Sequence, residues 1–373
     1  MQTVSDELNQ SMFRAYDIRT PAALLTDDLA VRLASAEAVY FRDVLGVSGV
    51  LLSYDARRTG PHYLTIATDV FQKAGLDVLY LPGPASTSYF YYAAMRYPEY
   101  AAVMIGASHN PSGDTGQKIL GPGVTPIAGA IGPAGGLEKI RQLYCEGRNC
   151  STERWGRIRT IDLMTDFVGH SMQLAGVSAG SLKGTRILHD YVFGAAGREM
   201  MLAFDGAGVE LTPLHFTPDG DFPLGDPNPV KVNVIRAGLD RLTRGDFLFG
   251  SFFDGDGDRI DFYRGDGTNL SSSFLYAALL PDIRKRLAAG DLGVFADLKC
   301  NPLAIIEMAR AGVTVDVIRN GHSQIKQSLI EDDTRFGAVE ESAHFYEAFS
   351  LSESQRFCTE NTLYIALLAS RIW

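Results

Sequence analysis

The chain has 373 residues, enough for two or three domains that each bury a core of their own. Hydrophobic residues make up 46% and charged residues 21%, the balance of an ordinary globular protein, and 34 basic against 44 acidic side chains give a net charge of −10. That charge disfavours nucleic acid and anionic membrane surfaces as partners, so any phosphate site has to be local.

Neither export nor a membrane anchor is indicated. The N-terminus carries Asp6 and Glu7 instead of a basic start followed by an apolar core, and no later segment reaches the apolar length of a membrane span. The 4 cysteines form no CxxC pair, which gives little support to a zinc site or a disulfide framework. We therefore expect a cytoplasmic protein with reduced, mostly buried thiols.

Short β-branched or aromatic runs alternate with helical stretches, which predicts layers of strands and helices, that is, an α/β fold. The predicted strands are Val50–Tyr54, Val78–Leu81, Ala101–Ile105, Thr185–His189, Phe247–Phe253, Val294–Asp297 and Val313–Ile318. Apolar residues recur at helical spacing in Leu29–Val44, Val234–Leu242, Leu303–Ala311 and Thr362–Ile372. Several small α/β domains fit this pattern better than one barrel.

The first pattern with chemical content follows the predicted strand Ala101–Ile105. Gly106-Ala107-Ser108-His109-Asn110-Pro111 places Ser108 on a loop at the carboxyl end of a strand, where open α/β sheets bind ligands. A serine-hydrolase elbow would need Gly at position 110 and a helix directly after it, so acyl transfer is discounted. Ser, His and Asn also cap turns, which is the plainer interpretation. With Lys118 within reach and the acidic loop described below, the pattern predicts phosphoryl transfer through a serine.

The domain boundaries are expected where the composition changes. Gly121–Gly136 is dense in Gly, Pro and Ala and has no charged residue, so we expect a loop or an excursion from the first domain. Breaks near residues 149–157 and after Arg264 suggest two boundaries. The predicted domains are 1–153, 154–267 and 268–373.

Three carboxylates follow the apolar run Phe247–Phe253, in Asp254-Gly255-Asp256-Gly257-Asp258-Arg259. Crowded on one turn, Asp254, Asp256 and Asp258 repel one another. A hard cation such as Mg²⁺ relieves the repulsion and leaves coordination positions open for a phosphate oxygen. The arginine directly behind them suggests a phosphorylated substrate.

A plain turn and a calcium-binding EF-hand both fit this loop less well. A simple Asp-Gly turn would not require the third Asp or the Arg that follows it. An EF-hand needs Gly at loop position six and an acidic residue at position twelve, where the chain has Arg259 and Gly265. The sequence therefore predicts a divalent-cation site rather than calcium sensing.

Taken in order along the whole chain, these patterns resemble the α-D-phosphohexomutase family, most of all its bacterial phosphomannomutase/phosphoglucomutase branch. Phe13–Arg19 is similar to the family's N-terminal signature, Ala107–Pro111 to its phosphoserine loop and Asp254–Arg259 to its magnesium loop. Asp297–Cys300 and Gly321–Lys326 are similar to two segments that favour the mannose/glucose branch, and Glu340–His344 is similar to the sugar-binding loop.

Two local departures and one larger one accompany the resemblance. The family usually has Asn-Gly before its lysine, where this chain has Thr115-Gly116-Gln117-Lys118, and Ala343 replaces a Gly of the sugar loop. The family also ends in a fourth domain whose Arg-Ser-Gly-Thr loop grips the distal phosphate. The chain stops at Trp373, after what resembles the last helix of a third domain. We expect either a fragment or a phosphate grip supplied by other residues or another chain.

The resemblance implies three consecutive small α/β domains with mixed sheets around a central active-site cleft, the fourth, C-terminal domain being absent. It implies a phosphohexomutase that interconverts hexose 1-phosphate and hexose 6-phosphate, of mannose and/or glucose, through a phosphoserine and a bound 1,6-bisphosphate. Mg²⁺ would be the cofactor, hexose 1,6-bisphosphate the activator and a phosphorylated hexose the partner. A phosphoglucosamine mutase, or a catalytically incomplete sugar-phosphate-binding fragment, remains an alternative, and the sequence does not predict the oligomeric state.

The resemblance also assigns roles to residues. Ser108 would carry the phosphoryl group, Lys118 would move the proton, Arg19 would clamp phosphate, and His109 would catalyse or support by hydrogen bonding. The metal ligands would be Ser108, Asp254, Asp256 and Asp258. The substrate would contact Tyr16, Arg259, Lys299, His322, Glu340, Ser342 and His344. For Glu340 and Glu341, the plainer interpretation is a solvated charge pair after the strand Phe336–Val339.

Overall fold

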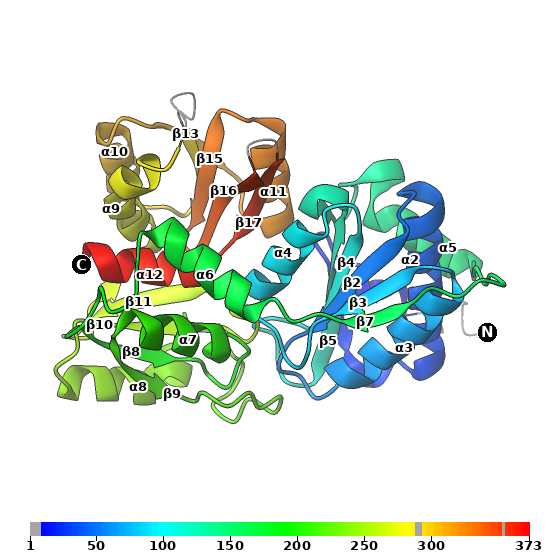
Figure 1. The fold of residues 1–373 in the computed structure, drawn as a ribbon, viewed down its shortest axis with the longest axis horizontal. Coiled ribbons are helices and arrows are strands. Elements are labelled where there is room, and N and C mark those ends of the chain that lie inside the picture. Colours follow the sequence, from blue (N-terminus) through cyan, green and yellow to red (C-terminus); the bar gives the residue numbers. More distant parts are fainter. Residues whose placement is uncertain (1–8, 288–292, 353–354) are drawn as a thin grey trace.

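The computed structural model describes residues 9–287, 293–352 and 355–373, so the N-terminal Asp6 and Glu7 lie outside the described residues. In the described part of the chain, the strands form three sheets, each mixed in direction and each built from its own stretch of sequence. Figure 1 shows the first sheet on one side and the second and third stacked on the other. The predicted mixed α/β fold is confirmed.

The first sheet has the strand order β1-β5-β4-β2-β3-β7, with β6 paired to β5. A parallel core is followed by antiparallel strands at one edge. The strands are β1 (Ile18–Pro21), β2 (Gly49–Tyr54), β3 (Asp77–Tyr80), β4 (Ala101–Ile105), β5 (Asp114–Gly121), β6 (Thr125–Ile127) and β7 (Ile158–Thr160). One face packs on α2 (Asp27–Val39), α3 (Gly60–Lys73) and α5 (Leu137–Glu146).

The second sheet has the order β12-β11-β10-β8-β9. Its strands are β8 (Arg186–Asp190), β9 (Glu210–Leu214), β10 (Phe249–Phe253), β11 (Ile260–Arg264) and β12 (Asn269–Leu270). The helices α6 (Met164–Ala175) and α7 (Gly197–Ala207) belong to the large shared core, whereas α8 (Val232–Arg244) packs on the opposite face. Every residue of β10 is buried, which positions the acidic loop that follows it.

The third sheet has the order β14-β13-β15-β16-β17. Its strands are β13 (Gly293–Asp297), β14 (Thr314–Ile318), β15 (Arg335–Glu340), β16 (His344–Ser352) and β17 (Gln355–Glu360). The helices α9 (Ser272–Arg284) and α10 (Pro302–Arg310) lie on one face and α11 (His322–Glu331) on the other. The sugar-loop segment is the tight turn from β15 into β16.

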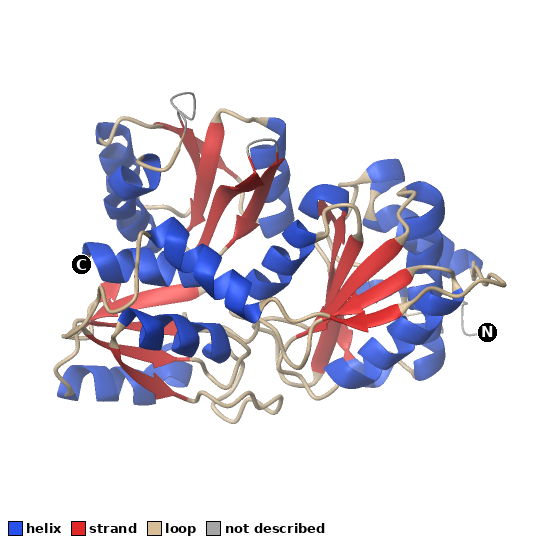
Figure 2. Cartoon of the chain, viewed as in Figure 1, coloured by secondary structure: helices blue, strands red, loops and turns tan. Residues whose placement is uncertain are grey.

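The helix α4 (Thr87–Arg96) joins the first sheet to the rest of the molecule. It begins at Ser86, whose hydroxyl accepts a hydrogen bond from Tyr89 N, and all its residues before Arg96 are buried. A helix that is apolar all round needs cover on every side. It packs against the first sheet, α6 and β17, so one hydrophobic cluster runs through it into all three sheets. Figure 2 shows this helix between the sheets.

The last helix, α12 (Thr362–Ile372), lies between the second and third sheets (Figure 1) and packs on α6. Trp373 stacks on Phe249 of β10, with ring centroids 5.2 Å apart. The predicted last helix therefore forms with the expected bounds, and it covers the second sheet as well as the third. Among the helices of the described residues, none combines the length and the apolar character needed to cross a membrane.

The segment expected as a loop, Gly121–Gly136, is more ordered than the sequence predicts. Residues 125–127 form β6, because Ile127 is buried and the strand pairs with β5. Of the two expectations, a loop or an excursion from the first domain, the loop is therefore wrong for these residues. The first sheet also takes β7 from residues 158–160, beyond the expected boundary at residue 153. The domain boundaries themselves stay a prediction.

Candidate active site

The Ser108 loop follows β4 at the edge of the first sheet that faces the second. Gly106 lies so close to Asp55 that an added Cβ would come within 2.4 Å of its Oδ2. Ser108 has φ +48, a left-handed conformation that strains a residue with a Cβ. Its side chain is buried, and its Oγ donates to Asp254 Oδ2 at 2.8 Å. The structure thus brings the predicted nucleophile onto the predicted metal loop.

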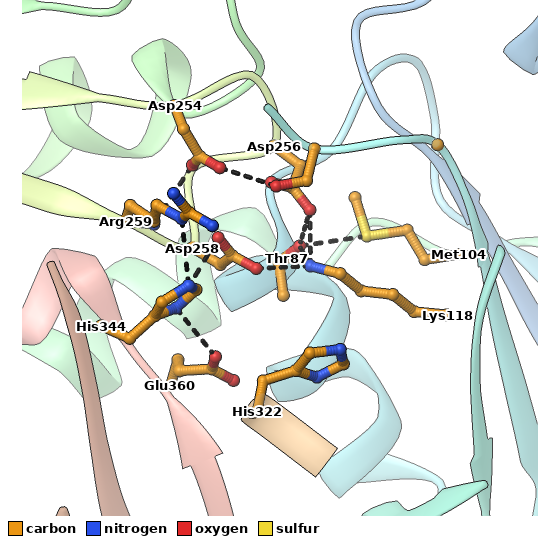
Figure 3. Close-up of polar contacts among 12 residues, drawn as sticks. Thr87, Met104, Lys118, Asp254, Asp256, Asp258, Arg259, His322, His344 and Glu360 are labelled. Carbon is orange, nitrogen blue, oxygen red and sulfur yellow. Dashed lines mark hydrogen bonds and ion pairs between the residues drawn. The ribbon is translucent and has the colours of Figure 1, made fainter. Parts of the chain in front are cut away.

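The acidic loop after β10 gathers three buried carboxylates. Oxygens of Asp254, Asp256 and Asp258 all lie within 4.8 Å of one another. Asp256 Oδ1 and Asp258 Oδ1 are buried without a hydrogen-bond partner among the described residues. Figure 3 shows these side chains converging on one point. Hard oxygen donors with free lone pairs are what Mg²⁺ prefers, so the three aspartates fit this ion.

Two cationic side chains offset part of the negative charge. Lys118 Nζ donates to Asp256 Oδ2 at 2.6 Å and to Asp258 Oδ2 at 2.5 Å. The charge of Arg259 acts to lower the pKa of Asp254 and Asp258, and its backbone N–H donates to Asp254 Oδ1 at 3.1 Å. Burial disfavours the charged form of Lys118, yet the two carboxylates hold its pKa well above its usual value. In this arrangement Lys118 is therefore an ammonium group.

The three aspartates do not share the charge equally. Burial, and then repulsion by Asp258 and Asp256, raise the pKa of Asp254 well above its usual range. Burial acts in the same direction on Asp258, but Lys118, His344 and Arg259 hold the pKa of that carboxyl well below its usual value. Asp254, which receives the Ser108 hydroxyl, is thus the member of the triad least compensated by nearby cations.

The N-terminus of α4 supports the same loop from the first sheet. Thr87 N donates to the carbonyl oxygen of Asp256 at 2.8 Å, and Thr87 Oγ1 donates to Asp256 Oδ2 at 2.7 Å. The positive end of the helix dipole adds a small favourable term for the carboxylates. Thr87 was not predicted from the sequence, because Ser86-Thr87 carries only the signal of a helix start.

A cavity of about 480 Å³ opens in front of Ser108 and is lined by all three sheets. Its lining includes every predicted substrate-binding residue, namely Tyr16, Arg259, Lys299, His322, Glu340, Ser342 and His344. Ser108, His109, Lys118, Arg19 and Asp258 also reach it. Five further lining residues were not among the predicted site residues, namely Asp17, Asn110, Val230, Asn320 and Gly321.

Glu340 is held from two sides. Its Oε1 accepts from Gly321 N at 3.2 Å, and its Oε2 accepts from the Tyr346 hydroxyl in a short hydrogen bond. The side chain is 4% exposed, so the alternative of a solvated charge pair is wrong for Glu340. Ala343, which replaces a Gly in the resemblance, has φ +72 and fits the turn only in a conformation that favours glycine.

His344 joins the sugar loop to the acidic loop. Arg259 Nε donates to His344 Nε2 at 3.0 Å, and His344 Nδ1 lies 3.3 Å from Glu360 Oε1. Burial lowers the pKa of His344, but Asp258 and Glu360 raise it, and the net shift is upward. Lys326 Nζ holds the other oxygen of Glu360 at 3.2 Å. Glu360 was missed because it stands alone at the end of β17.

The remaining predicted residues sit at the rim. Arg19 donates to Asp17 Oδ2 at 2.8 Å and to the carbonyl oxygen of Gly106 at 3.2 Å, beside the Ser108 loop. His109 Nδ1 lies 3.3 Å from Ser108 Oγ. Burial, and then the charge of Arg259, lower the pKa of His109 to about 3, so the ring is neutral. Since the Ser108 hydroxyl proton is directed at Asp254, a neutral ring protonated at Nδ1 can donate to the serine oxygen.

The three α/β sheets, the strand-end serine and the buried aspartate triad define a class, the phosphohexomutases. Family models agree: phosphoglucomutase/phosphomannomutase α/β/α domain I matches residues 10–131, and domain II matches residues 165–267. The chain belongs to the phosphoglucomutase/phosphomannomutase family, whose members are mutases of the isomerase class.

Individual relatives agree with the family assignment. A phosphomannomutase of Salmonella montevideo is 28% identical over 362 residues, which cover 93% of this chain and 75% of the relative. A phosphomannomutase of Escherichia coli K12 is 28% identical over 360 residues, covering 92% of this chain and 74% of the relative.

Solved structures show the same fold. A phosphoglucomutase/phosphomannomutase family protein of Burkholderia thailandensis superimposes with a TM-score of 0.84 at 24% identity, covering 98% of this chain and 77% of that one. An N-acetylphosphoglucosamine mutase of Aspergillus fumigatus, in complex with GlcNAc-6P and magnesium, has a TM-score of 0.57 at 13% identity. That alignment covers 100% of this chain and 80% of the Aspergillus chain.

Proposed function

We propose that this chain interconverts hexose 1-phosphates and hexose 6-phosphates of mannose or glucose, with Ser108 carrying the phosphoryl group. One observation carries the proposal: Ser108 Oγ meets Asp254 Oδ2 at 2.8 Å on the wall of a cavity lined with cationic side chains. A hydrolytic serine would need an acyl-binding oxyanion site, whereas a serine beside three carboxylates suits a phosphate and a divalent cation.

The transfer needs little covalent assistance from the protein. The bond between phosphorus and Ser108 Oγ breaks as a bond forms from phosphorus to a sugar hydroxyl oxygen, and the hydroxyl proton ends on Ser108. The sugar then carries two phosphates and reorients in the cavity. The bond from its other phosphorus to the sugar oxygen breaks as a bond to Ser108 Oγ forms, and the Ser108 hydroxyl proton ends on the sugar oxygen. Such steps depend on alignment and charge neutralisation, which Arg19, Arg259 and Lys299 around the cavity are placed to give.

Asp254, Asp256 and Asp258 would hold Mg²⁺ together with an oxygen of the Ser108 phosphate. The bound ion supplies charge neutralisation for the transferring phosphoryl group. Lys118 donates to two of these carboxylates, and their negative charge holds its proton in place. Mg²⁺ on the same carboxylates would weaken their hold on that proton. Lys118 could then give its proton to Ser108 and take one from the attacking sugar hydroxyl.

The sugar loop would select the substrate by its hydroxyl groups. The Gly321 N–H and Tyr346 OH fix the Glu340 carboxylate, and each oxygen keeps a further lone pair for a sugar hydroxyl. Ser342 can both donate and accept beside it, and His344 and Lys299 complete the wall. A fixed, buried acceptor discriminates strongly against sugars that lack the matching hydroxyl.

The test is turnover of mannose 1-phosphate, glucose 1-phosphate and glucosamine 6-phosphate by this chain, followed by ³¹P NMR. The assay contains Mg²⁺ and a catalytic amount of glucose 1,6-bisphosphate as the activator. Formation of mannose or glucose 6-phosphate supports the proposal. Exclusive turnover of the amino sugar supports the glucosamine alternative. Phosphate uptake on Ser108 without sugar turnover supports the binding fragment, and no uptake at all contradicts the proposal.

A further inference from the structure

Against the backbone of the Ser108 loop lies a buried ion pair that the reaction described above does not use. Arg57 and Asp55 follow β2, the parallel neighbour of β4, and their side chains are 1% and 0% exposed. Arg57 Nε lies 3.2 Å from Asp55 Oδ2. A charged pair this deep persists only if its remaining hydrogen-bonding groups find partners.

The guanidinium group of Arg57 finds all its other partners in the loop between β4 and β5 and at the first residue of β5. Nη2 donates to the carbonyl oxygens of Ser108 at 2.9 Å and Asn110 at 2.7 Å. Nη1 donates to the carbonyl oxygens of Pro111 at 2.5 Å and Asp114 at 3.1 Å. With the bond from Nε to Asp55, the five N–H groups of an arginine are all used. No other side chain presents such a fork.

Asp55 holds the same loop from its beginning. Its Oδ2 accepts from Ala107 N at 3.0 Å, and its Oδ1 accepts from Arg57 N at 2.9 Å. The backbone is therefore fixed immediately before Ser108 and at its carbonyl group. Ser108 itself has φ +48, a conformation that persists only where the surroundings impose it.

The Asp55–Arg57 pair, here called the Arg57 clamp, is covered by residues from the chain segment between β9 and β10 of the second sheet. The Phe222 ring lies 5.2 Å from Arg57 Cζ. An added Cβ on Gly220 would come within 2.5 Å of Arg58 N, so the two backbones touch. On the other side, an added Cβ on Gly255 would come within 2.7 Å of the Ser108 carbonyl oxygen. Arg57 thus fixes the serine loop at the place where it contacts the acidic loop.

We propose that Arg57 is a positioning residue for phosphoryl transfer: by binding the carbonyl groups on both sides of His109, it aims Ser108 Oγ at the aspartate triad. The inference rests on the proposed function of Ser108. Without the guanidinium fork, the loop carbonyls lose their Arg57 donors, Asp55 keeps only its two backbone donors, and Ser108 can leave its left-handed conformation. Phosphoryl transfer then slows although the cavity residues that bind the sugar are unchanged.

The experiment measures the rate at which Ser108 takes phosphate from glucose 1,6-bisphosphate, by mass spectrometry, over a range of bisphosphate concentrations. Arg57→Lys keeps the charge opposite Asp55 but has no planar fork, and Arg57→Met removes both. Arg58→Met is the matched control, since Arg58 is 71% exposed and pairs with Asp219 at the same interface. We expect a saturating rate at least about tenfold lower for Arg57→Lys, a half-saturating concentration within about twofold, and no change for the control.

A second readout is independent of chemistry and covers the case in which Arg57→Met fails to fold. Amide hydrogen exchange of the peptide spanning residues 106–114 should be faster in Arg57→Lys than in the wild type and unchanged in Arg58→Met. A folded Arg57→Lys protein with the wild-type rate and wild-type exchange would overturn the inference. If the wild type takes no phosphate, the proposed function fails instead, and the exchange rates alone decide whether Arg57 holds the loop.

Discussion

Arg57 binds the backbone of the Ser108 loop and donates every guanidinium N–H to fixed partners within the protein. The acidic loop meets the Ser108 side chain, and its Asp256 Oδ1 and Asp258 Oδ1 are buried with no hydrogen-bond partner in the part of the chain that the structure describes. Both regions bury charge at the end of a strand. The first is satisfied internally and can only hold a shape, whereas the second keeps ligand positions free at the cost of mutual repulsion.

The contrast separates groups that position from groups that react. Buried polar atoms are normally paired, so a cluster of unpaired carboxylate oxygens at a cavity wall calls for an external ligand. A fully paired arginine calls for none. Glu340 lies between the two cases, because its oxygens are fixed by the Gly321 N–H and Tyr346 OH yet face the cavity.

The largest effect should come from Ser108→Ala, which removes the only group that we assign as phosphoryl acceptor. We expect complete loss of phosphate incorporation from glucose 1,6-bisphosphate, measured by intact mass spectrometry. The fold should remain, because Arg57 binds the backbone carbonyl of this residue and not its side chain. Phosphate still found on the purified variant would show that another residue is the acceptor.

Asp256→Asn should weaken Mg²⁺ binding about tenfold or more, since it removes one of three charged oxygen ligands. The measurement is the Mg²⁺ concentration that gives half-maximal phosphate incorporation on Ser108. Asp266→Asn is the control, because Asp266 lies exposed beyond β11, where it forms an ion pair with Arg264. An unchanged Mg²⁺ titration for Asp256→Asn would place the ion elsewhere.

Glu340→Ala should separate sugar recognition from serine chemistry. Ser108 phosphorylation should persist, whereas kcat/KM for the sugar phosphate should fall about ten- to hundred-fold, the size expected when a charged hydrogen-bond partner is lost. Coupled enzyme assays measure the second quantity and mass spectrometry the first. Normal turnover would remove Glu340 from the substrate pocket and make it a purely internal partner of Tyr346.

The sequence was most informative where one stretch of chain carries the whole signal. Buried strands such as β4 and β10 read as continuous apolar runs, and their residues are buried throughout. The aspartates of the acidic loop stand together, so their convergence could be predicted from spacing alone. The helix α4 could not be predicted from the sequence, because its run of tyrosines and alanines is apolar on every side and shows no apolar stripe at helical spacing.

Residues that act alone from distant elements left no signal. Arg57 reaches the Ser108 loop because β2 lies beside β4, and Glu360 reaches His344 because β17 pairs with β16. Thr87 reaches Asp256 where the first sheet meets the second. Strand β5 was also missed: it begins with polar residues and carries Lys118, which points into the site instead of alternating with solvent. Tertiary contacts gave these residues their roles, and a local pattern does not encode such contacts.

The smallest effect concerns the scaffold side of the comparison, at His189 in β8. Burial lowers the pKa of His189 to about 3 in the folded protein, whereas the pKa of a histidine in an unfolded chain is about 6.5. Between pH 3 and pH 6.5, His189 binds a proton in the unfolded chain but not in the folded protein. Its contribution to the free energy of unfolding is therefore fully present above about pH 6.5 and falls as the pH drops, by at most about 1.4 kcal/mol per pH unit. The test is urea unfolding at pH 7.5 and pH 5.5, which should show this loss in the wild type and a smaller one in His189→Phe.

A phenylalanine suits this position because the His189 ring packs on the rings of Phe204 and Phe253, although the Tyr191 hydroxyl loses its hydrogen-bond partner. Equal pH dependence of the two proteins would show that the protonation of His189 does not cause the loss of stability.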